Sequence, residues 1–222
     1  MSLSPLHYAP PTEPWLAIMH EDRDMVVVDK PSGLLSVPGR TPELSDSVLS
    51  RVRRVHFHAQ AVHRLDLGTS GVLVIAIRRK AEAALRQQFQ DRQTRKVYLA
   101  MVHGRMESDT GTIDLPLICD WPNRPLQKVD FALGKPSVTR WRVLDYDAAM
   151  DATRVGLEPV TGRSHQLRVH MRELGHPMLG DPLYAPETIR GRSPRLLLHA
   201  VSLSMPHPLT GTACTFESPP PF

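Results

Sequence analysis

Proline is the residue that most restricts how this chain can fold. It occurs 21 times among 222 residues and is spread along the whole sequence. Proline breaks helix interiors and holds the residue before it in an extended conformation. We therefore expect few long helices. No internal repeat, heptad pattern or convincing linker divides the chain, which predicts one domain over residues 15–219 and an N-terminal tail over residues 1–14.

Hydrophobic patterning indicates more strands than helices. Apolar runs at residues 25–28 and 72–77 predict strands buried on both faces. Weaker strands are expected at residues 97–102, 138–144, 153–157 and 196–203. Apolar spacing of three and four residues predicts helices at 80–91 and 164–174, with a shorter one at 46–55. Because these elements do not alternate regularly, we predict an α+β fold, a mixed, largely antiparallel sheet flanked by helices and loops.

Charge and composition restrict the compartment and the partners that we expect for this chain. The longest apolar run, residues 72–77, is far shorter than a membrane span, and the N-terminus has no secretory hydrophobic core. Two widely separated cysteines fit a reducing cytoplasm. The net charge is +4, with 22 arginines and 5 lysines. Arginine suits bidentate contacts to phosphate, so the balance permits a nucleic-acid partner without establishing one.

Several common chemistries lack their sequence signatures. The chain has no Walker loop, dinucleotide-binding glycine motif, zinc-protease helix or nucleophile-elbow motif. His56, His58 and His63 are close together, but no cysteine or paired carboxylate completes a zinc site with them. Their plainer interpretation is as polar loop residues, and we expect no metal centre.

Two segments indicate a functional site. The first, His-Arg-Leu-Asp-Leu-Gly-Thr-Ser-Gly at residues 63–71, directly precedes a predicted buried strand. An aspartate there, Asp66, would ordinarily cap a turn. Arg64 lies two residues away, in a loop of small residues that could admit a substrate.

The second segment, Thr-Gly-Arg-Ser-His-Gln-Leu-Arg-Val-His, covers residues 161–170. Its glycine allows close approach, and Arg163 is expected at the start of a helix. One face of that helix carries His165, Arg168 and Arg172, and its plainer interpretation is a solvated basic face. Together the two segments suggest one ionised carboxylate held by an arginine, which is suited to nucleophilic attack beside a surface that binds a polyanion.

These segments resemble the RluA family of pseudouridine synthases. The resemblance rests on residues 63–71, on Lys-Val-Tyr-Leu-Ala at 96–100 and on Gly-Arg-Ser-His-Gln-Leu-Arg at 162–168. Supporting matches lie at residues 29–34, 175–181 and 196–200, and the likeness extends over about residues 15–219. Residues 115–125, which include Asp-Trp-Pro-Asn-Arg-Pro, are similar to the compact subgroup of the family that acts on both transfer and ribosomal RNA.

The resemblance implies an isomerase that converts uridine to pseudouridine in structured stem-loops without cofactor or metal. By the same resemblance, the targets are uridine 32 of tRNA anticodon stem-loops and uridine 746 of 23S rRNA. Asp66 would be the nucleophile and Arg163 its partner. Tyr98 would pack on the uracil and could relay the proton leaving C5, its plainer interpretation being a tyrosine of the core.

The substrate-binding residues implied are His63, Arg64, Leu167, Arg168 and Leu198. Arg64 is hypothesised to hold the gap left by the target base, and the two leucines to pack around the site. Phosphate contacts could come from Arg51, Arg53, Arg54, Arg78, Arg79, Lys80, Arg92, Arg95 and Lys96.

Many relatives carry an N-terminal S4-type RNA-binding domain, which we do not expect here because the segment at residues 30–33 comes so early. A monomer that recognises a small stem-loop by itself is therefore expected. The open alternatives are a synthase for tRNA or rRNA alone, a non-catalytic RNA-binding protein of the same fold, and a metal-dependent nuclease or deaminase, which would lack a ligand set.

Overall fold

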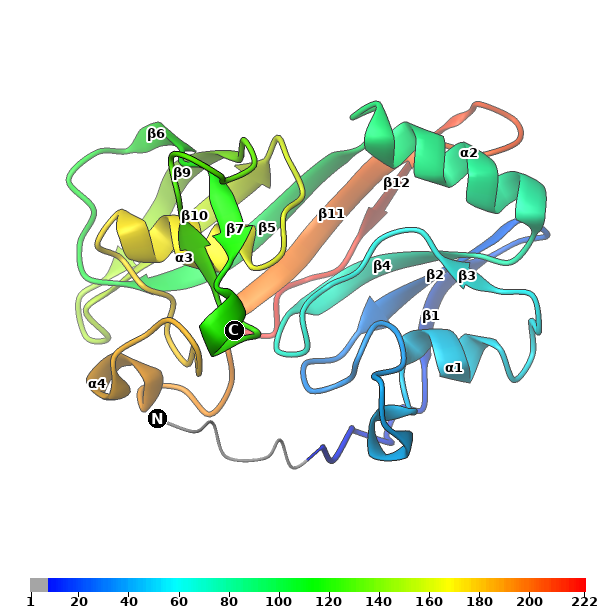
Figure 1. Cartoon of the computed structure of the whole chain (residues 1–222), viewed down its shortest axis with the longest axis horizontal. Coiled ribbons are helices and arrows are strands. Elements are labelled where there is room, and N and C mark those ends of the chain that lie inside the picture. Colours follow the sequence, from blue (N-terminus) through cyan, green and yellow to red (C-terminus); the bar gives the residue numbers. More distant parts are fainter. Residues whose placement is uncertain (1–7) are drawn as a thin grey trace.

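A mixed β-sheet forms the body of the protein in the computed structural model, which describes residues 8–222 (Figure 1). In this part of the chain the main sheet has ten strands, in the order β1-β2-β4-β11-β5-β10-β9-β6, with β3 beside β4 and β12 beside β11. The strands are β1 (Ala17–Glu21), β2 (Met25–Lys30), β3 (Gln60–Ala61), β4 (Ser70–Ala76), β5 (Arg95–His103), β6 (Thr110–Asp114), β9 (Val138–Asp147), β10 (Ala152–Pro159), β11 (Leu198–Pro206) and β12 (Ala213–Glu217). A separate hairpin pairs β7 (Leu117–Cys119) with β8 (Gln127–Val129).

The helices are short, as the prolines predict. They are α1 (Val48–Val52), α2 (Arg79–Gln90), α3 (Gln166–Glu173) and α4 (Glu187–Arg190), with 3-10 turns η1 (Pro42–Leu44) and η2 (Trp121–Asn123). The predicted strands and helices are each present, with ends moved by a few residues. The strands that were not predicted are β1, β3, β6, β7, β8 and β12. β3, β7 and β8 have only two or three residues, and β1, β6 and β12 have exposed and half-buried residues interspersed, so none has the continuous apolar run that marks a buried strand.

One parallel pairing, between β4 and β11, interrupts an otherwise antiparallel sheet. There Gly71 has a φ of 109°, and a Cβ on it would lie 2.2 Å from the carbonyl oxygen of Ala200. Only glycine permits this approach of two backbones. The neighbouring Ser70 hydroxyl bonds to Nδ1 of His199 at 2.8 Å, which fastens the same junction. The prediction of an α+β fold with a mixed, largely antiparallel sheet is confirmed.

Helices α1 and α2 cover opposite faces of β2. Val26 and Val28 pack in the cluster that contains α1, whereas Met25 and Val27 pack in the cluster that contains Ala81 of α2. Successive residues of a strand point to opposite faces, which explains why this strand is apolar throughout.

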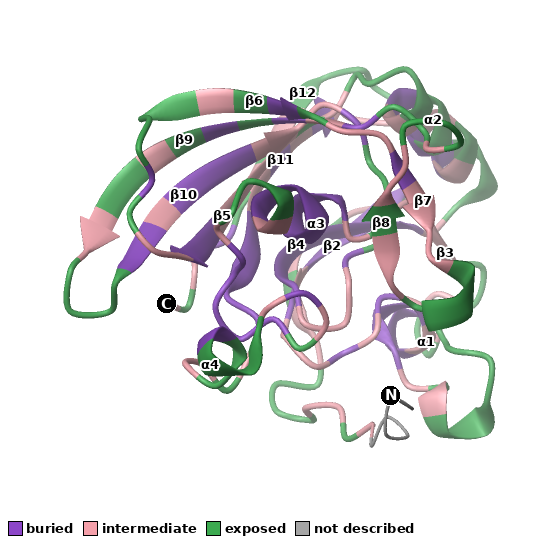
Figure 2. Ribbon diagram, turned by 60° about the vertical axis from the view of Figure 1, so that its left-hand side comes forward, coloured by how far each residue is buried: buried purple, intermediate pink, exposed green. Residues whose placement is uncertain are grey.

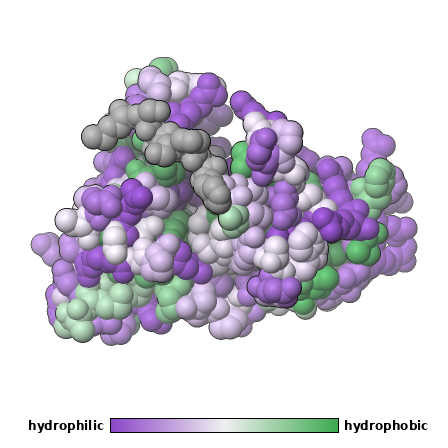
Figure 3. Space-filling view, turned by 90° about the horizontal axis from the view of Figure 1, so that it is seen from below, coloured by the Kyte–Doolittle hydropathy of each residue, from purple (hydrophilic) through white to green (hydrophobic). Residues whose placement is uncertain are grey.

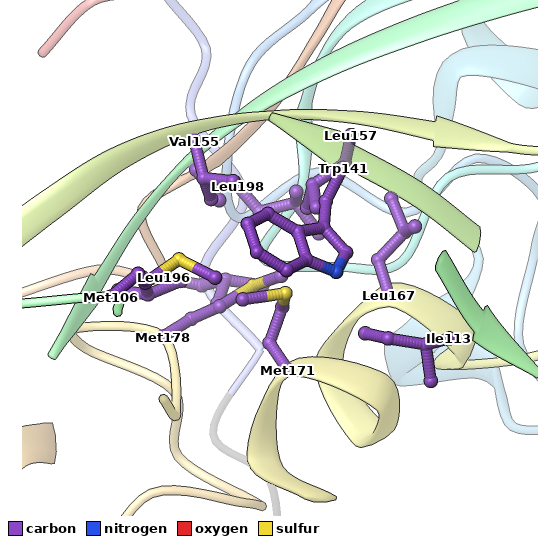
Figure 4. Packing of buried hydrophobic residues seen from close by; sticks show 12 residues of the cluster. Met106, Ile113, Trp141, Val155, Leu157, Leu167, Met171, Met178, Leu196 and Leu198 are labelled. Carbon is purple, nitrogen blue, oxygen red and sulfur yellow. The ribbon is translucent and has the colours of Figure 1, made fainter. Parts of the chain in front are cut away.

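Helix α3 lies within the curve of the other half of the sheet (Figure 2). Its Leu167 and Met171 are buried against β5, β9 and β10, and the indole ring of Trp141 lies between this helix and the sheet (Figure 4). Tyr98 of β5 packs against this cluster and also against the cluster of α1. The two halves of the core therefore meet at Tyr98.

The N-terminal tail is partly joined to the domain. Residues 1–7 of the predicted tail lie outside the described residues. The hydroxyl of Tyr8 donates to the carbonyl of Asp46 at 2.8 Å, and Arg51 donates to the carbonyl of Pro11.

The face of the molecule seen from below is largely hydrophilic with smaller apolar patches (Figure 3). Across residues 8–222, every helix is too short or too polar to cross a membrane.

Candidate active site

A cavity of about 530 Å³ opens where the two halves of the core meet. Its walls come from the loop that follows β3, from β5, from the C-terminal end of α2 and from the turn that leads into α3. All eight site residues predicted from the sequence line it: His63, Arg64, Asp66, Tyr98, Arg163, Leu167, Arg168 and Leu198. Segments far apart in the sequence are thus brought to one place.

Asp66 forms an ion pair with Arg168 rather than with Arg163. A guanidinium nitrogen of Arg168 lies 3.3 Å from Oδ2 of Asp66, while the rest of the guanidinium makes two bonds to Asp181, at 2.6 and 2.8 Å. Only 5% of the Arg168 side chain and 1% of Asp181 are exposed. The predicted pair with Arg163 is therefore wrong, and so is the interpretation of Arg168 as part of a solvated face.

The position at which α3 begins explains why Arg168, and not Arg163, reaches Asp66. The helix begins at Gln166, so Arg163 precedes it and stays exposed, with Nε 3.4 Å from the carbonyl of Pro136. Arg168 lies within the first turn and is buried beside Asp181 and Asp66. Arg163 lines the mouth of the cavity, where it can meet a substrate but not the carboxylate.

A buried lysine supports the loop that carries Asp66. Lys30 is fully buried, and its ammonium donates to the carbonyls of Pro31, Leu34 and Leu67 at 2.9, 2.7 and 3.3 Å. Burial lowers the pKa of Lys30 to about 7, against the opposing effect of the negative charge on Asp66. The ammonium thus fixes the backbone of Leu67, the residue that follows Asp66.

Two serines hold the backbone on both sides of Asp66. The Ser36 hydroxyl donates to the carbonyl of Leu65 at 2.7 Å and accepts from its N–H at 3.0 Å. The Ser32 hydroxyl donates to the carbonyl of Gly68 at 2.8 Å. The segment at residues 29–34, noticed in the sequence only as a supporting match, therefore has a physical purpose, since it positions the carboxylate.

His165 and Tyr184 form a second support, which sequence reasoning missed. His165 has a φ of 54°, and its Nδ1 lies 2.6 Å from the hydroxyl of Tyr184. The Tyr184 hydroxyl also accepts from the N–H of Gln127 at 2.8 Å. The other ring nitrogen of His165 lies 3.9 Å from Asp66. Burial lowers the pKa of His165 and raises that of Tyr184 to about 12.

Tyr98 lines the cavity, and its hydroxyl has no hydrogen-bond partner among the residues that the structure describes. Burial, followed by the nearby charge of Asp66, raises the pKa of Tyr98, so the phenol is neutral. Leu167 and Leu198 are 7% and 3% exposed, and they belong to the core cluster behind the cavity. They pack around the site, as expected.

His63 is held by the fold as a neutral imidazole. Its Nε2 accepts the N–H of Val74 at 3.0 Å, and its ring stacks on Phe89 with centroids 4.5 Å apart. Burial, and then the positive charge of Lys96, lowers the pKa of His63 to about 3. Arg64, by contrast, is exposed at the cavity.

Among the basic residues expected to contact phosphate, Arg51 is wrongly assigned. Its guanidinium is buried and makes two bonds to Asp46, at 2.7 and 2.9 Å. It also donates to the carbonyls of Trp15 and Pro11. Arg51 therefore holds the N-terminal segment against α1.

Asp22, Asp24 and His207 are the group in residues 8–222 whose ligand atoms lie close enough to hold a metal ion, within 4.8 Å of one another. Asp22, however, already accepts from the N–H groups of Asp24 and Met25 and contacts His207 and His20. Although burial would raise the pKa of Asp22, these partners lower it overall. The group is sufficiently explained as the cap of the turn between β1 and β2.

A carboxylate beside a buried arginine, in a cavity edged by exposed basic side chains, defines an enzyme site for an anionic substrate. Residues 24–173 match the family model of RNA pseudouridylate synthases. The chain is 53% identical over 216 residues to the dual-specificity RNA pseudouridine synthase RluA of Escherichia coli K12, covering 97% of this chain and 98% of that protein. It is 49% identical over 217 residues to the RluA of Pasteurella multocida, covering 98% and 99%.

Among solved structures, human RNA pseudouridylate synthase domain containing 1 superposes with a TM-score of 0.80 at 29% identity, over 96% of this chain and 87% of that one. The chain therefore belongs to the RNA pseudouridylate synthase family, and it is an isomerase that acts on RNA. The resemblance found in the sequence is confirmed.

Proposed function

We propose that the cavity is the active site at which this protein converts uridine to pseudouridine in stem-loops of both transfer RNA and 23S ribosomal RNA. One observation carries the proposal: the Asp66 carboxylate, paired with Arg168, stands beside Tyr98 in a cavity. The similarity to dual-specificity relatives over nearly the whole chain supports two RNA classes. The proposed positions are uridine 32 of the tRNA anticodon stem-loop and uridine 746 of 23S rRNA.

The geometry supports a division of labour. Asp66 is the nucleophile that helps to detach uracil from its ribose, and the ion pair with Arg168 fixes the direction of its carboxylate. Tyr98 packs against the uracil while it is detached, and its free hydroxyl can relay the proton that leaves C5. The supports from Lys30, Ser36 and His165 hold this arrangement before the substrate arrives.

A base must leave its stack to enter the cavity, at a cost of a few kcal/mol. Loop nucleotides are cheaper targets because they are already partly unstacked. Arg64 is exposed at the cavity, and we assign it to the space that the extruded base leaves.

A projecting hairpin offers a second contact for RNA. Trp121 is 63% exposed, with the guanidinium of Arg124 over its ring at 4.2 Å, and Phe131 and Leu133 are 79% and 73% exposed. Exposed aromatic and arginine side chains stack well on unpaired bases. The hairpin is tied to the site, since Gln127 donates to Tyr184. Trp121 and Arg124 belong to the segment whose likeness to the dual-specificity subgroup is described above.

The proposed reaction uses no cofactor or metal ion, and the enzyme is proposed to work as a monomer in the cytoplasm, where its RNA substrates are made. The chemistry needs only a carboxylate, an arginine and a tyrosine, all of which the cavity supplies. Activity should therefore survive EDTA, whereas a metal-dependent nuclease or deaminase would lose it.

The test is pseudouridine formation on unmodified tRNA and 23S rRNA transcripts in the presence of EDTA. Carbodiimide-dependent reverse-transcription stops locate each product. Wild type should give one stop in each RNA, and Asp66→Asn should give none while its RNA affinity stays within about tenfold, because the fold and the basic surface remain. Asp145→Asn, at an exposed position outside the cavity, is the matched control and should retain activity.

A stop in one RNA class alone would contradict dual specificity and leave a single-substrate synthase. Binding without any stop would instead favour a non-catalytic RNA-binding protein. Substantial product from Asp66→Asn would remove Asp66 from the role of nucleophile.

A further inference from the structure

Lys96 is a cation inside the cavity that the proposed chemistry does not use. It lies two residues before Tyr98 on β5, and side chains two apart on a strand project from the same face. Both residues line the cavity. Lys96 is half-buried, and it therefore stands in the wall of the cavity rather than on the outer surface.

No carboxylate within the described residues pairs with Lys96, and no acceptor there lies within hydrogen-bond distance of its ammonium. The neighbouring Arg95, by contrast, bonds to Glu158 at 2.8 Å. The burial of Lys96 lowers its pKa, which means that the fold disfavours the charge at this position. The ammonium thus lacks the acceptor that would compensate its burial, and an anionic ligand in the cavity would supply one.

The wall opposite Lys96 allows a ligand to come close. A Cβ on Gly162 would lie only 3.8 Å from Nζ of Lys96, so the ammonium faces the backbone of the turn that leads into α3. Gly162 and the adjacent Arg163 are exposed. His63 lies near enough for the charge of Lys96 to lower its pKa, and an imidazole offers no negative charge to compensate that ammonium. Two cations, Lys96 and Arg163, therefore line this part of the cavity, and neither pairs with a carboxylate from the described residues.

We propose that Lys96 and the Gly162–Arg163 turn bind a backbone phosphate that flanks the uridine entering the cavity. This inference rests on the proposed function, because it assigns the ligand to the same RNA. An extruded nucleotide brings its two flanking phosphates to the rim of the site, and a phosphate oxygen supplies the acceptor that the ammonium lacks. Lys96 thereby fixes the depth to which the nucleotide enters.

The test measures affinity for an anticodon stem-loop RNA in which the phosphate on one side of the target uridine, or on the other, is replaced by an uncharged methylphosphonate. Asp66→Asn is the parent, so that no turnover occurs. One of the two replacements should weaken binding by the parent about tenfold. With Lys96→Met added, binding to the unmodified RNA should weaken similarly, and that replacement should then cause a much smaller loss than in the parent, because only the Gly162–Arg163 turn still holds the phosphate.

Salt dependence gives an independent readout. Adding Lys96→Met should reduce the slope of log Kd against log salt concentration by about 0.7 to 0.9, the value for one phosphate contact. Lys96→Arg should keep the slope and the methylphosphonate effect. Lys80→Met, a control at an exposed position on α2 outside the cavity, should keep the methylphosphonate effect. Lys96→Met should be at least as resistant to heat as the parent, and Lys96→Gln serves in its place if it is not.

Equal methylphosphonate losses with and without Lys96, or an unchanged affinity and salt slope in Lys96→Met, would overturn the phosphate site. The proposed function fails separately, if wild type forms no pseudouridine. If the methylphosphonate effect still depends on Lys96 in such an inactive protein, the phosphate site would be supported although the proposed reaction is not.

Discussion

Replacing Arg168 should affect stability and catalysis through two different carboxylates. The guanidinium makes two bonds to Asp181, which is 1% exposed, and one longer contact to Asp66, which is 20% exposed. Arg168→Met leaves the Asp181 charge buried without its cation, and breaking such a pair costs about 3–5 kcal/mol. It also removes the fixed positive group beside Asp66, for which we expect a rate lower by about 10²- to 10³-fold.

A double variant separates the two effects. Asp181 also accepts the N–H groups of Leu183 and Tyr184, and asparagine at that position keeps an oxygen for both while removing the charge. Arg168→Met/Asp181→Asn should therefore return to within about 1–2 kcal/mol of wild-type stability. It should remain slow, because Asp66 still lacks its partner.

The assays are urea unfolding for stability and single-turnover pseudouridine formation for rate. Arg163→Met is the matched control: this arginine is exposed, so its stability should change by less than about 0.5 kcal/mol. Recovery of the rate together with stability in the double variant would refute the direct role of Arg168 beside Asp66. A slower reaction in Arg163→Met than in Arg168→Met would restore Arg163 as the essential arginine.

Three further predictions follow from single contacts. The pKa of His63 is lowered from 6.5 to about 3, so below pH 6.5 the unfolded chain binds a proton that the folded protein does not. The free energy of unfolding therefore decreases by up to about 1.4 kcal/mol for each unit by which the pH falls. Urea unfolding from pH 7 to 4 should show a smaller loss of stability in His63→Gln than in wild type, and an equal loss would contradict this. Gly71→Ala would place a Cβ 2.2 Å from the Ala200 oxygen at a φ of 109°. Thermal unfolding should show a free energy of unfolding lower by more than about 3 kcal/mol. A near-neutral result would show that β4 and β11 can separate without penalty. Tyr98→Phe removes a hydroxyl that has no partner in the described residues, so stability should stay within about 1 kcal/mol while turnover falls at least about 10²-fold; unaltered turnover would limit Tyr98 to packing.

Much of the site followed from local sequence. The apolar run of β4 comes directly after a loop of small residues, which placed Asp66 just before a buried strand. The order of the short motifs indicated the family. Tyr98 belongs to a segment whose apolar residues predict a strand, and the alternation of side chains along β5 puts Lys96 on the same face. These features depend on neighbours within a few residues, which a single sequence displays directly.

The supports of Asp66 could not be predicted in the same way. Lys30 and Ser36 reach carbonyl groups 37 and 29 residues away, and Tyr184 reaches His165 across helix α3 and the loop that follows it. Nothing in a lysine or serine of the sequence identifies its acceptor. Such contacts arise only when separate segments are packed together.

The choice between Arg163 and Arg168 shows where sequence reasoning ends. The helical period correctly grouped His165, Arg168 and Arg172 on one face, but a period does not say which way that face points. Helix α3 lies within the curve of the sheet (Figure 2), Arg168 is buried between two carboxylates, and Arg163 precedes the helix and is exposed. The sequence by itself determined which residue types carry the chemistry; the packing of the helix against the sheet decided which arginine reaches Asp66, because that depends on distances between segments far apart in the chain.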